Sequence, residues 1–211
     1  MSRAWSRLAG IVRRTATRHV IRRSRSLFAR YVAGHDVDLI EDGLYLGSAA
    51  ATKNASQLHA KGIGAVVSIL AQPDLAHAHR LRDHGIGNLV IRARDDDRQS
   101  LLQVLPEVIA FLDAARAKGT AVLVHCHAGM SRSAAVLTAC LMIRHGLSTA
   151  EGLARVQAAR TFINPGEGFR KQLSILESLL GADGIGRDEL ADLLHAHTDP
   201  SLTMPEILCP R

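Results

Sequence analysis

Aromatic side chains are scarce in this chain of 211 residues: Phe, Trp and Tyr together make up 3% of it, and the single tryptophan is Trp5. Base stacking on aromatic rings, the usual route to single-stranded nucleic acid, is therefore disfavoured. The interior has to be built from Ala, Val, Ile and Leu, and a chain of this length can bury one such core.

Cysteines and long apolar runs are scarce as well. The chain has three cysteines, an odd number without paired spacing, which excludes a disulfide scaffold and indicates a reducing, cytoplasmic type of compartment. The most apolar stretches, 63–73 and 133–143, are shorter than the roughly 18 residues of a membrane-spanning segment.

Acidic residues are missing from the first 35 positions, which hold nine arginines and no lysine. Residues 36–211 hold 17 basic and 20 acidic side chains, so the body of the protein is mildly acidic. This division of charge disfavours nucleic acid as a partner of the body.

The basic arm 1–35 allows three interpretations. Its arginines, with Trp5, Leu8 and Val12 at helical spacing, are typical of a transit peptide to the mitochondrion or another organelle. The same pattern would suit a helix on an anionic membrane surface. A disordered basic tail of a cytoplasmic protein fits equally well.

Elements of two kinds alternate along the rest of the chain, from 36 to about 180. Strands are predicted at 44–46, 65–70, 88–91 and 121–124, of which 65–70 is fully buried and 121–124 is central. Helices are predicted at 74–84, from about 100 to 118, from near Arg132, after Ser148 and after Asn164. This order predicts an α/β fold with a central, mostly parallel sheet flanked by helices. Residues 181–211 read as a loose tail with a short helix at 187–195.

Three helix starts carry the capping-box pattern, in which a small polar residue is followed three positions later by Glu or Gln. They are Ser100 with Gln103, Ser148 with Glu151, and Asn164 with Glu167. Pro106 lies inside the first of these helices, so that helix could begin nearer to the proline. Pro165 would occupy the first position of the third helix.

The segment most informative about chemistry is Val-His-Cys-His-Ala-Gly-Met-Ser-Arg-Ser at 124–133, between a strand and a helix. A loop that leads into a helix N-terminus points backbone N–H groups into its own concavity and binds anions there. The same field lowers the pKa of a cysteine thiol, here Cys126. Arg132 can hold two phosphate oxygens with its guanidinium, and Gly129 lets the backbone approach them.

This segment resembles the signature of the cysteine-dependent protein phosphatases, His-Cys-x-x-Gly-x-x-Arg-Ser/Thr, and 128–133 resembles their dual-specificity branch. The resemblance extends over about 36–180. Gly43-Leu44-Tyr45-Leu46-Gly47 resembles the opening strand of that family, and 160–173 resembles the entry to its closing helix.

The resemblance implies a reaction that needs no metal or other cofactor. Cys126 would attack phosphorus and form a cysteinyl-phosphate, Arg132 would hold the phosphate oxygens, and Ser133 would hydrogen-bond the sulfur. His125 would orient the loop from behind, and His127 could lie at its rim. The residues expected to surround the substrate phosphate are His127, Ala128, Gly129, Met130 and Ser131.

The family also uses a general acid on an upstream loop. Asp95, Asp96 and Asp97 follow the strand at 88–91 and precede the long helix, where that loop is expected. Aligning 107–112 with the corresponding helix of the family places Asp95 at the acid position and makes Asp96 the second choice. The other aspartates are interpreted as solvated loop residues.

The preferred function is a phosphatase acting on phosphotyrosine and phosphoserine/threonine in proteins, because the variable loop positions carry no lysine or arginine. There are three alternatives: a phosphoinositide or other lipid-phosphate phosphatase, a pseudophosphatase that only binds phosphoproteins, and a sulfurtransferase.

The His-x-His pairs at 77/79, 125/127 and 195/197 lack a third ligand at recognisable spacing and are interpreted as surface histidines rather than metal ligands. Cys140 is expected in the core, and the oligomeric state is left open.

Overall fold

The computed structural model describes residues 37–181, 192, 194 and 206–208. All of them belong to one compact unit, Val37–Arg211. The basic arm 1–35, most of the helix expected at 187–195, His195, His197 and Cys209 lie outside the described residues.

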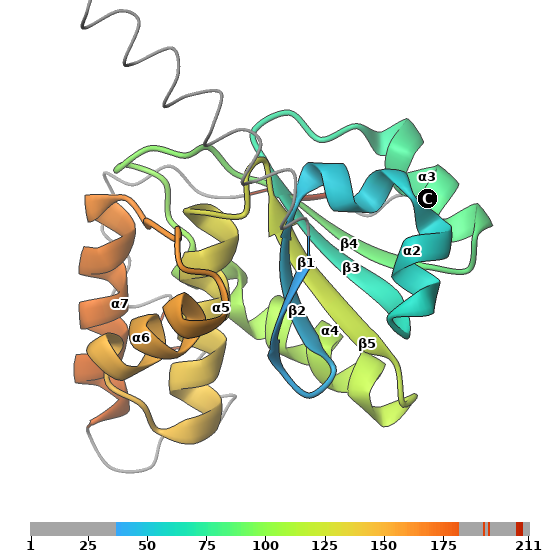
Figure 1. The fold of residues 1–211 in the computed structure, drawn as a ribbon. Coiled ribbons are helices and arrows are strands. Elements are labelled where there is room, and N and C mark those ends of the chain that lie inside the picture. Colours follow the sequence, from blue (N-terminus) through green and yellow to red (C-terminus); the bar gives the residue numbers. More distant parts are fainter. Residues whose placement is uncertain (1–36, 182–191, 193, 195–205, 209–211) are drawn as a thin grey trace, which may run out of the picture. The chain divides into compact units, whose positions relative to one another are not determined.

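A six-stranded sheet forms the centre of this unit (Figure 1), and its strands run in the order β1-β2-β5-β3-β4-β6. The inner strands β2, β5, β3 and β4 are parallel, while β1 and β6 pair antiparallel at the two edges. The expected α/β fold with a mostly parallel sheet is confirmed. The strands are β1 (Val37–Glu41), β2 (Leu44–Ser48), β3 (Ile63–Leu70), β4 (Gly87–Arg92), β5 (Ala121–Cys126) and β6 (Glu206–Leu208).

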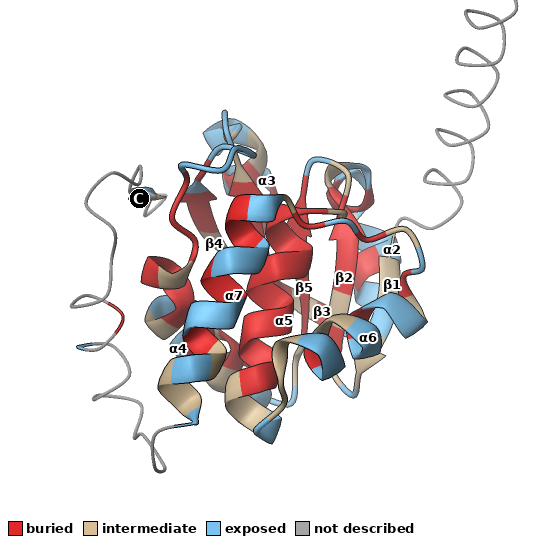
Figure 2. Cartoon of the chain, turned by 90° about the vertical axis from the view of Figure 1, so that its left-hand side faces the viewer, coloured by how far each residue is buried: buried red, intermediate tan, exposed pale blue. Residues whose placement is uncertain are grey.

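Helices cover both faces of the sheet. Helices α2 (Ala55–Ala60) and α3 (Leu75–Asp83) lie on one face, and the short helix η1 (Ala49–Lys53) accompanies them. The other face carries α4 (Leu105–Ala117), α5 (Arg132–His145), α6 (Thr149–Ala159) and α7 (Glu167–Leu180), as Figures 1 and 2 show. No described helix is long and apolar enough to cross a bilayer.

The alternation of side chains along the strands fills two cores. On β5, Val122 and Val124 pack into the larger core under α4, α5 and α7, whereas Leu123 packs into the smaller core under α2 and α3. All three side chains are buried. A parallel strand covered on both faces reads as a continuous apolar run, which is why this strand was recognisable from its sequence.

The three predicted helix starts have different outcomes. The capping box at Ser148 is confirmed, since its hydroxyl accepts from the Glu151 N–H and the Glu151 carboxylate accepts from the Ser148 N–H. The box at Ser100 is wrong: η2 (Leu102–Val104) comes first, and α4 begins at Leu105 with Pro106 in its first turn. The Leu101 N–H is held instead by the side chain of Gln172 at 2.8 Å.

The box at Asn164 is also wrong, because α7 begins at Glu167 and its N-cap is Gly166. The Asn164 N–H donates to the Met130 carbonyl at 2.8 Å, and the Pro165 carbonyl accepts from Arg170. Asn164 therefore contacts the loop after β5, whereas Pro165 contacts a side chain of the helix that follows it.

Residues near the C-terminus join the sheet edge. Strand β6 pairs with β4, and Arg92 forms an ion pair with Glu206 at 3.0 Å. The Leu194 carbonyl accepts a hydrogen bond from Gln103 at 2.7 Å, and the Leu194 side chain is buried in the larger core. The described part of the tail is thus attached to the body.

Candidate active site

The parallel strands β2, β3 and β5 end at the same edge of the sheet, and the segment singled out from the sequence lies there. Cys126 is the last residue of β5, and Arg132 is the first residue of α5. Residues 127–131 connect the two without regular structure. The structure therefore has the strand, loop and helix start that the sequence predicts.

Four successive carbonyl groups of this loop, those of residues 127–130, face outward and are held by other segments. The His127 carbonyl accepts from the Ala49 N–H at 3.1 Å, and the Met130 carbonyl accepts from the Asn164 N–H at 2.8 Å. Between them, Arg160 donates to the Ala128 and Gly129 carbonyls at 3.0 and 2.8 Å. In a trans peptide the N–H points opposite to the carbonyl, so the following amides face the inside of the loop and form a cradle for an anion.

Gly129 is required by the geometry of this cradle. Its φ of +69° lies in the left-handed region, and a Cβ built there would stand 2.3 Å from the carbonyl oxygen of Gly47. Strand β2 and the loop therefore approach so closely that only glycine fits.

Arg160 is a functional residue whose role the sequence did not indicate, although it stands in the segment 160–173 that resembles the family. Its side chain is 0% exposed and pairs with Asp38 of β1 at 2.5 Å, and its guanidinium stacks 4.3 Å from the Phe162 ring centroid. One buried arginine thus connects β1 to two loop carbonyls. A fully buried arginine could not be distinguished from a surface arginine by sequence pattern.

Cys126 lies at the base of the cradle and is 1% exposed. Burial raises the pKa of its thiol, but the hydrogen bonds from Ser133 side chain and backbone, the Arg132 charge and the Met130 N–H outweigh it and lower the pKa overall. The Ser133 hydroxyl donates to the sulfur at 3.2 Å. A thiolate is the form that attacks electrophiles, so this environment favours a nucleophile.

Arg132 and Asp95 meet beside the loop. The Arg132 side chain is buried, and its Nη1 donates to the Ala93 carbonyl at 3.0 Å. Its Nε lies 3.6 Å from the Asp95 carboxylate, which also accepts a hydrogen bond from the Ser131 hydroxyl at 2.6 Å. The carboxylate is 43% exposed, so Asp95 can reach both the loop and an incoming molecule.

The two neighbouring aspartates are directed elsewhere. Asp96 pairs with Arg94 at 3.2 Å and accepts from the Arg98 N–H. Asp97 accepts from the Gly168 N–H at 2.9 Å, and a Cβ on Gly168 would lie 2.6 Å from the Asp97 backbone. Of these three aspartates, Asp95 is the one that contacts the Cys126 loop. Asp97 is more than a solvated residue, since it anchors the start of α7.

His125 supports the cysteine from behind. Its side chain is buried, so the interpretation of the pair 125/127 as surface histidines is wrong for His125. Burial, above all, lowers its pKa to about 4, so the ring is neutral at pH 7. Its Nδ1 lies 3.1 Å from the Cys126 carbonyl, which can only accept, and its Nε2 lies 2.8 Å from the Ser68 hydroxyl. The neutral ring therefore donates from Nδ1 and accepts at Nε2, a contact that fixes the end of β5.

The other residues singled out from the sequence differ in how far they are buried. His127 is exposed, and Ala128 and Met130 are half-buried. Cys140 is buried in the core, where burial raises the pKa of its thiol to about 12. In the described part of the chain, no three His, Cys, Asp or Glu side chains gather closely enough to hold a metal ion.

Comparison with known proteins matches residues 44–178 to the family "Dual specificity phosphatase, catalytic domain". Dual specificity protein phosphatase 12 of Rattus norvegicus is 38% identical over 147 residues, which cover 70% of this chain and 42% of that protein. Dual specificity protein phosphatase 1 of Arabidopsis thaliana is 36% identical over 139 residues, covering 66% of this chain and 68% of that protein. The crystal structure of human DUSP28 is similar with a TM-score of 0.63 and 35% identity, over 70% of this chain and 96% of that one. The chain thus spans less than half the length of the first relative.

Proposed function

We propose that this chain, which belongs to the dual specificity phosphatase family, hydrolyses phosphomonoesters through a cysteinyl-phosphate. One observation carries the proposal: the Cys126 thiol, with its lowered pKa, lies in a loop whose four successive carbonyls are held on the outside. Such a loop presents its amides to an anion and a sulfur nucleophile to the atom at the anion's centre.

In the first step the Cys126 thiolate attacks phosphorus, and the bond between phosphorus and the ester oxygen breaks. Arg132 and the inward amides stabilise the three remaining oxygens in the transition state. Asp95, held beside the loop by Ser131, gives its proton to the leaving oxygen. General-acid assistance of this kind contributes about 10²–10⁴-fold to the rate.

In the second step water attacks the phosphorus of the cysteinyl-phosphate, Asp95 accepts a proton from that water, and the bond between sulfur and phosphorus breaks. The products are inorganic phosphate and the free thiolate. The Ser133 hydroxyl stabilises the departing sulfur, because it donates to this atom at 3.2 Å in the structure.

Phosphoproteins are the substrate class that we favour. The variable loop positions His127, Ala128, Met130 and Ser131 carry no lysine or arginine, whereas recognition of polyanionic lipid headgroups needs fixed positive charge around the phosphate. The test measures the turnover of equal numbers of phosphotyrosine peptides, phosphoserine/threonine peptides and phosphoinositides. Faster turnover of the phosphoinositides would overturn this choice.

Turnover of p-nitrophenyl phosphate tests the reaction itself. Vanadate should inhibit it, a chelator should leave it unchanged, and Cys126→Ser should abolish it while the fold is retained. Cys140→Ala is the matched control. Because this second cysteine is buried in the core, away from the loop, the variant enzyme should keep its activity. Residual activity of Cys126→Ser above about one per cent, where loss of a nucleophile costs orders of magnitude, would show that Cys126 is not the nucleophile.

A further inference from the structure

A cavity of about 420 Å³ lies behind the active site, on the face of the sheet that α2 and α3 cover. Side chains alternate along each strand, and those of Val66 and Leu123 pack into the smaller core on that face. Ser68 and His125 are two residues further along the same strands, so they point to the same face and line the cavity. The loop 127–131 contributes no residue to it.

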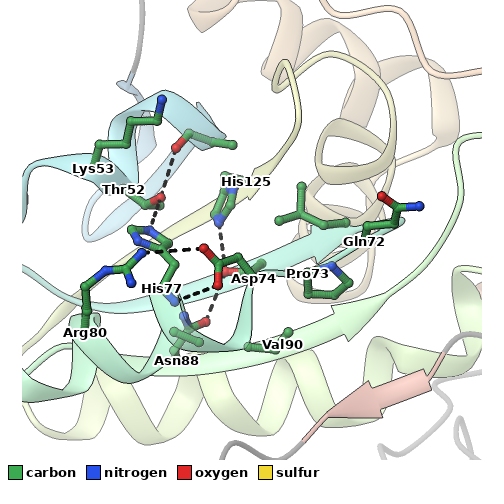
Figure 3. A pocket seen from close by; sticks show the side chains of 14 residues that line it. Thr52, Lys53, Gln72, Pro73, Asp74, His77, Arg80, Asn88, Val90 and His125 are labelled. Carbon is green, nitrogen blue, oxygen red and sulfur yellow. Dashed lines mark hydrogen bonds and ion pairs between the residues drawn. The ribbon is translucent and has the colours of Figure 1, made fainter.

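The polar lining of the cavity is already organised (Figure 3). Thr52 of η1 and His77 of α3 are joined by a hydrogen bond of 2.8 Å. Ser68 contacts the Asn88 amide at 3.1 Å and the ring of His125 at 2.8 Å. An occupant would therefore meet side chains that are held in place before it arrives, which lowers the entropic cost of binding.

Positive charge exceeds negative charge around this cavity. Lys53 and Arg80 line it together with one acid, Asp74. That carboxylate is engaged, because it accepts from the His77 N–H at 3.0 Å and pairs with Arg80 at 3.5 Å. Lys53 forms no ion pair with any described residue. Burial, and then the charge of Arg80, lower the pKa of His77; Asp74 opposes this shift, and Lys53 adds a smaller lowering effect. The charges of all three side chains therefore reach the interior of the cavity.

The rest of the wall is mainly apolar. It is formed by Ala49, Leu70, Pro73, Ala78 and Val90, together with the amide side chain of Gln72. Cavities of about 300–1,000 Å³ with apolar walls and a few fixed polar groups are the size and type that bind small molecules. We propose that this cavity binds a small organic anion, a carboxylate attached to an apolar body, with the carboxylate near Lys53 and the body against the apolar part of the wall.

Calorimetric titration of the full chain with 2-naphthoate tests this proposal, with 2-naphthalenemethanol as the neutral analogue of the same shape. Naphthoate should bind saturably and at least about tenfold more tightly than the alcohol, a difference of about 1.4 kcal/mol. Vanadate should not displace it. Displacement by vanadate would put the anion in the Cys126 loop and overturn the proposal, as would the absence of saturable binding.

Two charge reversals locate the site. Lys53→Glu should weaken naphthoate binding at least about tenfold, whereas Lys118→Glu, an exposed lysine after α4, should change it less than twofold. Both lysines are exposed, so neither substitution should disturb the fold. Equal effects of the two reversals would show that the anion responds to the overall charge of this basic chain, and the proposal would fail.

Discussion

The carboxylate of Asp95 accepts a hydrogen bond of 2.6 Å from the hydroxyl of Ser131, although 36 positions separate the two residues. Ser131 also accepts from the Gly166 N–H at 3.3 Å. One hydroxyl group therefore connects the loop that carries Asp95, the loop that follows Cys126 and the start of α7. This contact is what distinguishes Asp95 from its two neighbours.

Asp95→Asn should slow hydrolysis of phosphotyrosine peptides by about 10²-fold or more, since the amide cannot protonate the leaving oxygen. The loss should be smaller for p-nitrophenyl phosphate, whose leaving group scarcely needs a proton, and the alkaline limb of the pH–rate profile should flatten. Asp96→Asn is the control. If Asp96→Asn shows this pattern and Asp95→Asn does not, the assignment of the acid is off by one residue.

Arg160→Met should lower kcat/KM at least tenfold and destabilise the protein by about 3–5 kcal/mol, since it removes the loop contacts and leaves the Asp38 carboxylate without its partner. Arg160→Lys should keep the charge beside Asp38 but lose the two-pronged hold on the carbonyls. We therefore expect it to recover stability, measured by urea unfolding, more than it recovers kcat/KM. If Arg160→Lys recovered both stability and kcat/KM in full, only the charge of Arg160 would matter, and its hydrogen bonds to the loop carbonyls would not.

Ser133→Ala should raise the pKa of Cys126, because a hydrogen bond that favours the thiolate is lost. The acidic limb of kcat/KM should move to higher pH, by up to about one unit for a loss of 1.4 kcal/mol. Breakdown of the cysteinyl-phosphate should also slow, which a burst of p-nitrophenol would reveal. Ser174→Ala on the exposed side of α7 is the control, and an acidic limb that stays in place in both variants would argue against the role of Ser133.

His125 should make stability depend on pH. Burial lowers its pKa to about 4 from an ordinary 6.5, so the unfolded chain binds a proton that the folded protein refuses. The contribution of His125 to the free energy of unfolding is therefore fully present above pH 6.5. It is lost as the pH drops towards 4, which lowers the stability by about 3 kcal/mol. Urea unfolding at pH 7.5, 6, 5 and 4 measures it. His125→Asn should show a smaller fall, and an unchanged slope would exclude His125 as its source.

Deletion of residues 1–34 should leave turnover of p-nitrophenyl phosphate unchanged, because Asp95, Cys126, Arg132 and Ser133 all lie in the described unit. The deletion should instead weaken binding to anionic vesicles or change the location of the protein in cells, as proposed for a basic arm. A shortened protein that keeps its circular dichroism and loses activity would show that the arm belongs to the active domain.

The residues near Cys126 were predictable because their information is local. Strand, loop and helix start follow one another within 124–133. Asp95 was placed by aligning 107–112 with the corresponding helix of the family that the chain resembles. Arg160 and Gln172 could not be found in this way, since each holds a backbone segment more than 30 positions away. Such contacts exist only once α6 and α7 have packed on α5.

The edge strands were missed for a different reason. Strand β1 is half-exposed along most of its length and β6 has three residues, so neither shows a long apolar run. The helix starts at Ser100 and Asn164 were wrong because their backbone N–H groups found partners in distant segments. Local capping preferences are weak enough for tertiary contacts to override them.

The pairing of β6 with β4 bears on how the protein can be shortened for study. A version that ends at residue 181 would retain every residue assigned to the chemistry but would expose the hydrogen-bonding edge of β4 and uncover the site of Leu194. Open strand edges recruit other chains, so this version should self-associate more readily than the full chain. A purification tag is therefore better placed on the N-terminal side of residue 37 than at the C-terminus of a chain that lacks its last thirty residues.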